Sequence, residues 1–200
     1  MYNERLKNLL LAMSIGDGHV RKNVGELTVR HSIKQKDFCE EKAKILSEII
    51  NKNINVYEKI YNNYGCVRFS LSHPYLKEVR EFLYKDGIKT LDINILQKLS
   101  DESIAIWYMD DGSLYWKKRN GKHKTFEICI STCCSTIDEA KTICDFFNNR
   151  YDINMTIKKM KGRFSIRCGA NSSRKMLAKL KPYCLKGMEY KFDISRNIAL

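Results

Sequence analysis

A short apolar segment that ends in aspartate and glycine occurs twice in the chain. Residues 9–18 read LLLAMSIGDG and residues 103–112 read SIAIWYMDDG. In the first copy the large apolar residues recur at helical spacing, which predicts a helix with one face in the core. The glycine after each aspartate is where the helix should end, because glycine readily adopts the left-handed C-cap conformation. We therefore expect Asp17 and Asp111 at the C-terminal ends of two helices.

An aspartate is a poor residue for the C-terminal end of a helix. That end carries partial negative charge, so a carboxylate there costs roughly 0.3–1 kcal/mol. One such residue is unremarkable on a protein surface, and two ordinary exposed aspartates are the simplest alternative. Two in the same context, however, indicate a local rule that is broken for function. A divalent cation would remove the cost and use both acids as ligands.

The two segments resemble the paired signature of the LAGLIDADG homing endonucleases. The resemblance lies in LLAMSIGDG at residues 10–18 and IAIWYMDDG at residues 104–112, and the second is typical of the branch with two motifs in one chain. The order of the remaining elements resembles these intron-encoded monomeric enzymes from about Leu6 to about Ile194. The resemblance implies a monomer that binds double-stranded DNA.

The two motif copies differ where the family's helices contact each other. Family members often have small residues at the third and seventh places of the motif. Ala12 and Gly16 follow this pattern, but the second copy has Ile106 and Asp110. The sequence therefore predicts that the two helices pack asymmetrically.

The same series of patterns follows each motif. Each half reads α-β-β-α-β-β-α, so we expect an α+β fold of two units, residues 1–95 and 96–200, related by an approximate twofold axis. The motif helices would lie at the interface, and the antiparallel sheets would form a saddle. The expected hairpins and helices after the motifs are 19–34, 36–51, 53–72 and 74–84 in the first half, and 113–131, 136–150, 152–169 and 171–180 in the second.

The charge of the chain favours a polyanionic partner. There are 36 Lys and Arg residues against 23 Asp and Glu residues, a net charge of +13 that is spread over both halves. Such a distribution suits a long surface laid against nucleic acid, although a merely soluble basic protein is the alternative. The eight cysteines show no zinc-binding spacing. With no signal-peptide pattern and no apolar run of membrane-spanning length, we expect an intracellular protein with free thiols, in a bacterial cytoplasm or an organelle, and no contact with a membrane.

The outer faces of the predicted strands supply candidate DNA contacts. Successive strand residues point to opposite faces, and the faces turned away from the helices are rich in Arg, Lys, Ser, Thr and Tyr. These side chains carry the donors that phosphates and base edges accept. A plainly solvated sheet face is the alternative. The candidate DNA-binding residues are Arg21, Thr28, Arg30, Ser32, Lys34, Tyr57, Lys59, Arg68, Ser70, Lys117, Lys158, Arg163, Ser165 and Arg167.

Phosphodiester hydrolysis needs a nucleophile, charge neutralisation and a stabilised leaving oxygen, all of which carboxylate-held divalent ions supply. Asp17 and Asp111 are the ligands that we expect, and Mg²⁺ suits such hard oxygen donors. Mn²⁺ would substitute, and Ca²⁺ would support binding without cleavage. By resemblance, the backbone carbonyls of Gly16 and Asp110 would also hold metal, which leaves the Asp110 side chain incidental.

Two lysines complete the expected site. Lys89 and Lys191 close the two halves and, by resemblance, match basic residues beside the active sites of the monomeric enzymes. A lysine there could polarise the attacking water or offset phosphate charge; taken in isolation, each would be a surface residue. His31, His73 and His123 form no recognisable constellation in the sequence.

The resemblance implies a metal-dependent endonuclease that makes a double-strand break at a long asymmetric DNA target. A binding module on the same fold is the alternative, either an RNA maturase or a DNA-binding protein without cleavage. A degenerate relative would tend to lose a motif aspartate. Because both aspartates and both lysines persist, the sequence favours the nuclease.

Overall fold

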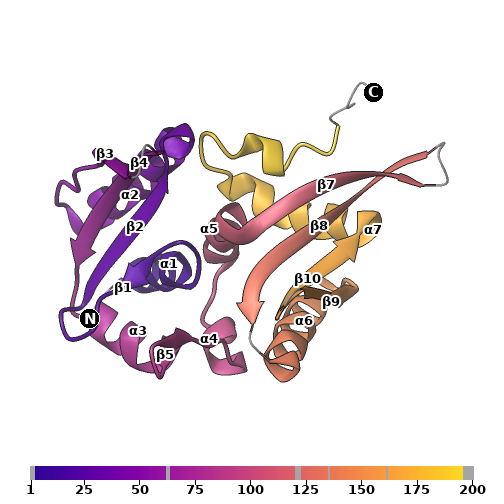
Figure 1. Cartoon of the computed structure of the whole chain (residues 1–200), viewed down its shortest axis with the longest axis horizontal. Coiled ribbons are helices and arrows are strands. Elements are labelled where there is room, and N and C mark those ends of the chain that lie inside the picture. Colours follow the sequence, from indigo (N-terminus) through magenta and orange to yellow (C-terminus); the bar gives the residue numbers. More distant parts are fainter. Residues whose placement is uncertain (1–2, 62–63, 120–122, 135, 161, 196–200) are drawn as a thin grey trace.

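The chain repeats one arrangement of helices around a four-stranded antiparallel sheet (Figure 1). The two sheets have corresponding strand orders, β1-β2-β4-β3 and β7-β8-β10-β9. The predicted α+β class with antiparallel sheets is confirmed, whereas the boundary between residues 95 and 96 stays a prediction. This computed structural model describes residues 3–61, 64–119, 123–134, 136–160 and 162–195.

The first copy contains every element that the sequence predicts and adds three more: a 3-10 helix before α2, and a small hairpin and a short helix at its end. Its elements are α1 (Glu4–Ile15), β1 (His19–Val20), β2 (Glu26–Ser32), the 3-10 helix η1 (Ile33–Gln35), α2 (Lys36–Ile50), β3 (Tyr57–Tyr61), β4 (Tyr64–Ser72), α3 (Tyr75–Leu83), β5 (Tyr84–Lys85), β6 (Ile88–Lys89) and α4 (Ile93–Gln97).

The second copy follows the same order and ends in two 3-10 turns. Its long β7–β8 hairpin has a turn, predicted at residues 119–122, that falls mostly outside the described residues. Its elements are α5 (Asp101–Asp111), β7 (Gly112–Arg119), β8 (His123–Cys134), α6 (Ile137–Tyr151), β9 (Met155–Met160), β10 (Arg163–Gly169), α7 (Ala170–Leu180), η2 (Lys181–Tyr183) and η3 (Glu189–Lys191).

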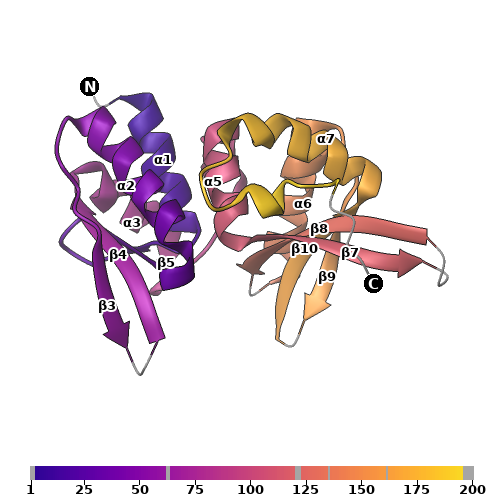
Figure 2. The same ribbon diagram turned by 90° about the horizontal axis from the view of Figure 1, so that it is seen from above.

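The sheet faces follow the predicted alternation in β2 and β4. Leu27 and Val29 of β2 are fully buried, as are Val67 and Phe69 of β4. In both halves the helices lie on one side of the strands, which leaves the other face of each sheet uncovered (Figure 2). This is the arrangement of an antiparallel sheet with one apolar and one solvated face.

Helices α1 and α5 lie side by side at the centre of the molecule (Figures 1 and 2). Every residue of α1 from Leu9 to Ile15 is buried, and so is every residue of α5 from Ser103 to Met109. A helix that is buried on all sides is part of the core rather than of the surface. The positions of the residues that follow these helices are therefore fixed by the core itself.

The predicted left-handed glycine caps are wrong for both helices. Helix α1 ends at Ile15, before the predicted cap Gly18, and its actual cap residue Gly16 has a φ of −71°. Neither Gly18 nor Gly112 has a positive φ, and the φ of Gly112 after α5 is −85°. Close packing explains these glycines instead. A Cβ atom at Gly16 would overlap Asp110 Oδ2, and a Cβ atom at Gly112 would overlap the ring of Tyr108. A glycine of one helix end thus faces an aspartate of the other, which is the asymmetry that the sequence predicts.

No helix in the described ranges is both long enough and apolar enough to cross a membrane. The seven cysteines whose side chains are described are free thiols, and six of them are buried.

We expect Gly16→Ala to destabilise the protein because its methyl group has no space beside the buried Asp110 side chain. Overpacking of this kind costs about 1–3 kcal/mol. Gly169→Ala is the matched control, since Gly169 has a φ of −74° and nothing within 4 Å of a Cβ atom. Urea unfolding of both variants measures the difference, and equal stabilities would contradict the close approach.

Candidate active site at the paired helix ends

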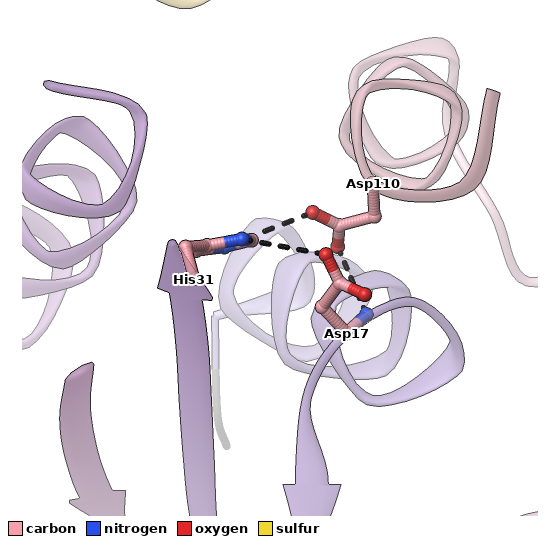
Figure 3. A group of neighbouring side chains, drawn as sticks. All are labelled: Asp17, His31 and Asp110. Atoms are coloured by element: carbon pink, nitrogen blue, oxygen red, sulfur yellow. Dashed lines mark hydrogen bonds and ion pairs between the residues drawn. The ribbon is translucent and has the colours of Figure 1, made fainter. Parts of the chain in front are cut away.

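The two motif aspartates lie where the paired helices end. Asp17 follows α1 by two residues, and Asp111 is the last residue of α5. The backbone N–H of Asp17 donates to Asp110 Oδ2 at 3.3 Å, so the two chain segments are in direct contact (Figure 3). The negative charges of Asp17 and Asp110 both act to raise the pKa of Asp111. Three carboxylates from two halves of the chain are therefore electrostatically coupled.

Each helix end is capped by the lysine that the sequence singled out in its own half. Lys89, on the small β5–β6 hairpin, donates to Gly16 O and to Gly18 O, both at 2.7 Å. Lys191, on η3, donates to Met109 O and, at 3.3 Å, to Asp110 O. A cation is favourable at the C-terminal end of a helix, where carbonyl groups lack intrahelical partners. The lysines thus offset the charge that the aspartates add there.

The carbonyls expected as metal ligands are the same ones that accept from these lysines. Gly16 O lies beside Lys89 and Asp110 O lies beside Lys191. A carbonyl oxygen has two lone pairs, so each keeps acceptor capacity besides the lysine contact. The ammonium groups and the expected metal positions are therefore next to each other.

The expectation that the Asp110 side chain is incidental is wrong. Its carboxylate is fully buried and forms an ion pair with the equally buried Lys42 of α2. A buried carboxylate needs such a partner, because an unpaired charge in the interior is strongly unfavourable. Lys42 also lies over the ring of Phe38, 4.2 Å from the centroid.

His31 belongs to this cluster, although the sequence analysis placed it in no constellation. Its Nδ1 lies 3.3 Å from Asp17 Oδ2, and its Nε2 lies 3.9 Å from Asp110 Oδ1 and 3.2 Å from Lys42 Nζ (Figure 3). Two features of the sequence point to His31 and to its partner Lys42. His31 shares the inward face of β2 with Leu27 and Val29, and Lys42 lies on the buried stripe of α2.

Asp17 is the accessible acid of the group. Its side chain is 41% exposed, whereas that of Asp110 is 0% exposed. Partial burial acts to raise the pKa of Asp17, but the contact with His31 and the positive charges of Lys42 and Lys191 outweigh it. The pKa of Asp17 therefore lies below its ordinary value, and this carboxylate is ionised at neutral pH.

Asp111 is held differently. Its Oδ2 accepts a hydrogen bond from Trp107 Nε1 at 3.0 Å. Burial, followed by the charges of Asp110 and Asp17, raises the pKa of Asp111 to about 7. Burial also lowers the pKa of Lys191, against the opposing pull of the three aspartates. The two motif acids thus have opposite pKa shifts.

The donor set fits a hard divalent cation. Carboxylate and carbonyl oxygens are the ligands that Mg²⁺ and Ca²⁺ take in proteins. Burial raises the pKa of Asp111 most, and the repulsion from Asp110 and Asp17 that adds to it is the kind that a bound cation relieves. Asp17, His31 and Asp110 also offer ligand atoms within 4.8 Å of one another. Lys42, however, already contacts both His31 and Asp110, so the half-exposed carboxylate of Asp17 is the member of this group that is most accessible to a cation.

The uncovered sheet face adjoins Asp17. A groove joins Asp17 to the outer face of β2 and β4, and it is lined by Asp17, His19, Arg21, Glu26, Thr28, Arg30, Arg68 and Ser70. A carboxylate beside a row of arginines and hydroxyls is suited to a phosphodiester backbone.

Most of the other predicted contact residues are also accessible. Lys117 is exposed but paired with Glu127, and Lys34 lies on η1 rather than on a strand. Ser165 is a correction: it is 1% exposed. Its hydroxyl donates to Lys158 O, and β10 shifts register against β8 between Phe164 and Ile166. The exposed or half-exposed candidates are Arg21, Thr28, Arg30, Ser32, Lys34, Tyr57, Lys59, Arg68, Ser70, Lys117, Lys158, Arg163 and Arg167.

The raised pKa of Asp111 predicts how the stability of the metal-free protein changes with pH. Between the ordinary pKa of 3.8 and about 7 the folded protein binds more protons than the unfolded chain, so its stability falls as pH rises. Each pKa unit corresponds to about 1.4 kcal/mol. We expect Asp111→Asn to be more stable than the wild type at pH 8 by on the order of 2–4 kcal/mol, with the gain shrinking towards pH 4.

Unfolding in chelator across this pH range measures the effect. Asp138→Asn, which alters an acid with an 85% exposed side chain at the start of α6, is the matched control. If Asp111→Asn increases the free energy of unfolding by the same amount at every pH, the pKa of Asp111 is not raised in the folded protein.

Several known proteins are similar to this chain. It is 27% identical over 207 residues to the cytochrome b mRNA maturase bI2 of Debaryomyces hansenii, covering 95% of this chain and 76% of that protein. It is 27% identical over 127 residues to the probable intron-encoded DNA endonuclease 3 of Mycosarcoma maydis, covering 61% of this chain and 88% of that protein. It is also 23% identical to protein RecA of Mycolicibacterium fallax, covering 92% of this chain but only 45% of that protein.

The fold also matches a solved structure. The homing endonuclease I-WcaI bound to its DNA recognition sequence superposes with a TM-score of 0.76 at 17% identity, over 96% of this chain and 87% of that one. The profile of the LAGLIDADG DNA endonuclease family matches residues 9–176, which include both motif segments and both sheets. The chain therefore belongs to the LAGLIDADG DNA endonuclease family.

Proposed function

We propose that this protein is a site-specific DNA endonuclease that makes a double-strand break at a long asymmetric target by Mg²⁺-dependent phosphodiester hydrolysis. The observation that carries the proposal is the pairing of Asp17 and Asp111 at adjoining helix ends, each end capped by a lysine. One acid at one helix end would serve one strand. The second acid, at the adjoining helix end, would serve the other strand.

In this proposal the protein supplies position and charge. Asp17, Asp111 and the carbonyls of Gly16 and Asp110 would hold divalent ions, whose chemistry is to activate water and neutralise the phosphate. Lys89 and Lys191 would stabilise negative charge as the phosphodiester is attacked. The basic sheet faces would align the duplex so that its two scissile phosphates meet the two acids.

Several finer features belong to the same proposal. Because one chain carries both motifs, we propose that it acts as a monomer, with residues 1–95 and 96–200 as its two halves. Mn²⁺ would replace Mg²⁺, while Ca²⁺ would support DNA binding only. Action on DNA inside a cell, in a bacterial cytoplasm or an organelle, follows from the substrate.

An RNA maturase is the second candidate. The similarity to a cytochrome b mRNA maturase over 95% of this chain favours it. A maturase needs the basic surface but not the acids, so the two functions separate experimentally at Asp17 and Asp111. The same protein could also perform both.

The test is selection of cleaved duplexes from a random library in Mg²⁺, followed by cleavage of the selected target. We expect Asp17→Asn and Asp111→Asn each to lower double-strand cleavage by about 10²-fold or more, the scale on which single charge-stabilising groups act. Binding in Ca²⁺ should remain near that of the wild type. Asp138→Asn, far from the helix ends in sequence and exposed, should cut normally. If no duplex is cut, or if both variants still cut, the proposal is wrong.

The proposed role of the uncovered sheet face predicts how DNA binding depends on salt. We expect Arg30→Gln to weaken binding to a duplex and to reduce the slope of log affinity against log salt by about one, because one phosphate contact is lost. Lys44→Gln is the matched control, since Lys44 is equally exposed but lies on α2, on the helix side of the sheet. Fluorescence anisotropy from low to high salt measures both slopes. Identical slopes would place the DNA on another surface.

A further inference from the structure

The buried cluster beside Asp17 has no counterpart in the other half of the chain. Pairing of β1 with β2 and of β7 with β8 aligns residue 28 with residue 129, and α2 and α6 are both 15 residues long. By the same offset, His31 corresponds to Thr132 and Lys42 corresponds to Ile143. His31 and Lys42 therefore contact Asp17 and Asp110, and uncharged side chains take their places in the other half.

Lys42 determines where the proton sits on His31. The ammonium group has only donors, and it lies 3.2 Å from Nε2 of the imidazole. Nε2 must then be the acceptor, with no proton of its own, so the single ring proton is on Nδ1. Nδ1 lies 3.3 Å from Asp17 Oδ2, although it forms no hydrogen bond of ordinary geometry within the described part of the chain. The carboxylate of Asp17 is therefore the acid that lies beside the Nδ1 proton.

Asp110 keeps Lys42 in this position. Both side chains are fully buried, and the carboxylate of Asp110 pairs with the ammonium group while it also accepts from the backbone of Asp17. The ring of Phe38 packs against Lys42. It also packs against His31, and the centroids of these two rings lie 5.0 Å apart. Lys42 therefore cannot turn away to solvent, and its ammonium group takes the place that a cation would occupy between His31 and Asp110.

We propose that Lys42 and Asp110 form a positioning device that fixes the Nδ1–H tautomer of His31 and thereby orients Asp17, but not Asp111. The proposal rests on the proposed endonuclease function. Groups that hold a metal ligand typically affect activity or affinity 10–100-fold. Asp111 has a separate support, the Trp107 indole. The two strands of a target would then depend on different residues outside the acids themselves.

The first measurement needs no activity. Long-range proton–nitrogen correlation spectra of the metal-free protein should show His31 with its proton on Nδ1, the signal being assigned by its loss in His31→Ala. In Lys42→Met/Asp110→Asn the tautomers should become mixed or reversed. The double variant is chosen because removal of Lys42 alone would leave a buried carboxylate unpaired, and such a protein is prone to unfold.

The second measurement follows each strand of the selected target separately. His31→Ala and the Lys42→Met/Asp110→Asn pair should change the ratio of the two nicking rates by about tenfold or more, in the same direction. His31→Asn, which keeps an N–H near the Nδ1 position, should restore part of the ratio. Trp107→Phe should shift the ratio in the opposite direction. Ile143→Met, at the position in α6 that corresponds to Lys42, should leave it unchanged.

The outcomes separate the two proposals. If the wild type cuts neither strand, the endonuclease function fails, and the spectra alone decide whether Lys42 fixes the histidine. A proton on Nε2 in the wild type, or spectra that do not change in the double variant, would overturn the positioning role. Equal slowing of both strands by His31→Ala would also overturn it, because the cluster would then be merely structural.

Discussion

Crowding of like charge at the end of the α1–α5 pair is the constraint on which the rest of this site depends. Asp17, Asp110 and Asp111 come together there because the two helices that precede them are buried against each other. Three carboxylates at two helix C-termini repel one another and also the partial negative charge of the helix ends. The fold compensates with three ammonium groups, those of Lys42, Lys89 and Lys191, each delivered by a different element.

The compensation is uneven, and this gives two similar residues different chemistry. Asp17 contacts a histidine and is open to solvent, so its pKa falls. Asp111 is more deeply placed beside Trp107 and feels the other two acids, so its pKa rises to about 7. At neutral pH one acid is ready to bind a cation, whereas the other must lose a proton first. A cation shared near both would favour that loss, which couples metal binding to proton release.

The sequence predicted the elements well because their patterns are local. The helix over residues 36–50 and the alternation in β2 and β4 follow from the spacing of apolar residues alone. The start of α6 is likewise local, because the N-cap Thr136 accepts through its hydroxyl from the backbone N–H of Glu139 at 3.2 Å. The lysines at 89 and 191 were found through the family resemblance, and the structure places both at the helix ends, although it does not test their roles.

What the sequence missed depends on contacts between distant residues. The sequence does not predict that Lys42, on the apolar stripe of α2, is buried, because a lysine is rarely fully buried unless it is paired. Its partner Asp110 is 68 positions away, on a helix of the other half. The reason for the glycines is also tertiary. The sequence predicts Gly16 only as a small residue of the motif, and the side chain that requires it, Asp110, is brought over it by the fold.

The asymmetry of the helix contact also explains why one half could acquire a charged cluster. Gly16 leaves room for a larger residue on the facing helix, and Asp110 fills that room. Once a carboxylate is buried there, a buried cation must accompany it, and α2 supplies Lys42. In the other half, the position of that lysine holds Ile143, which packs in an apolar core. A small-to-large difference between two repeated motifs, together with the buried lysine that it requires, thus gives the two acids different surroundings.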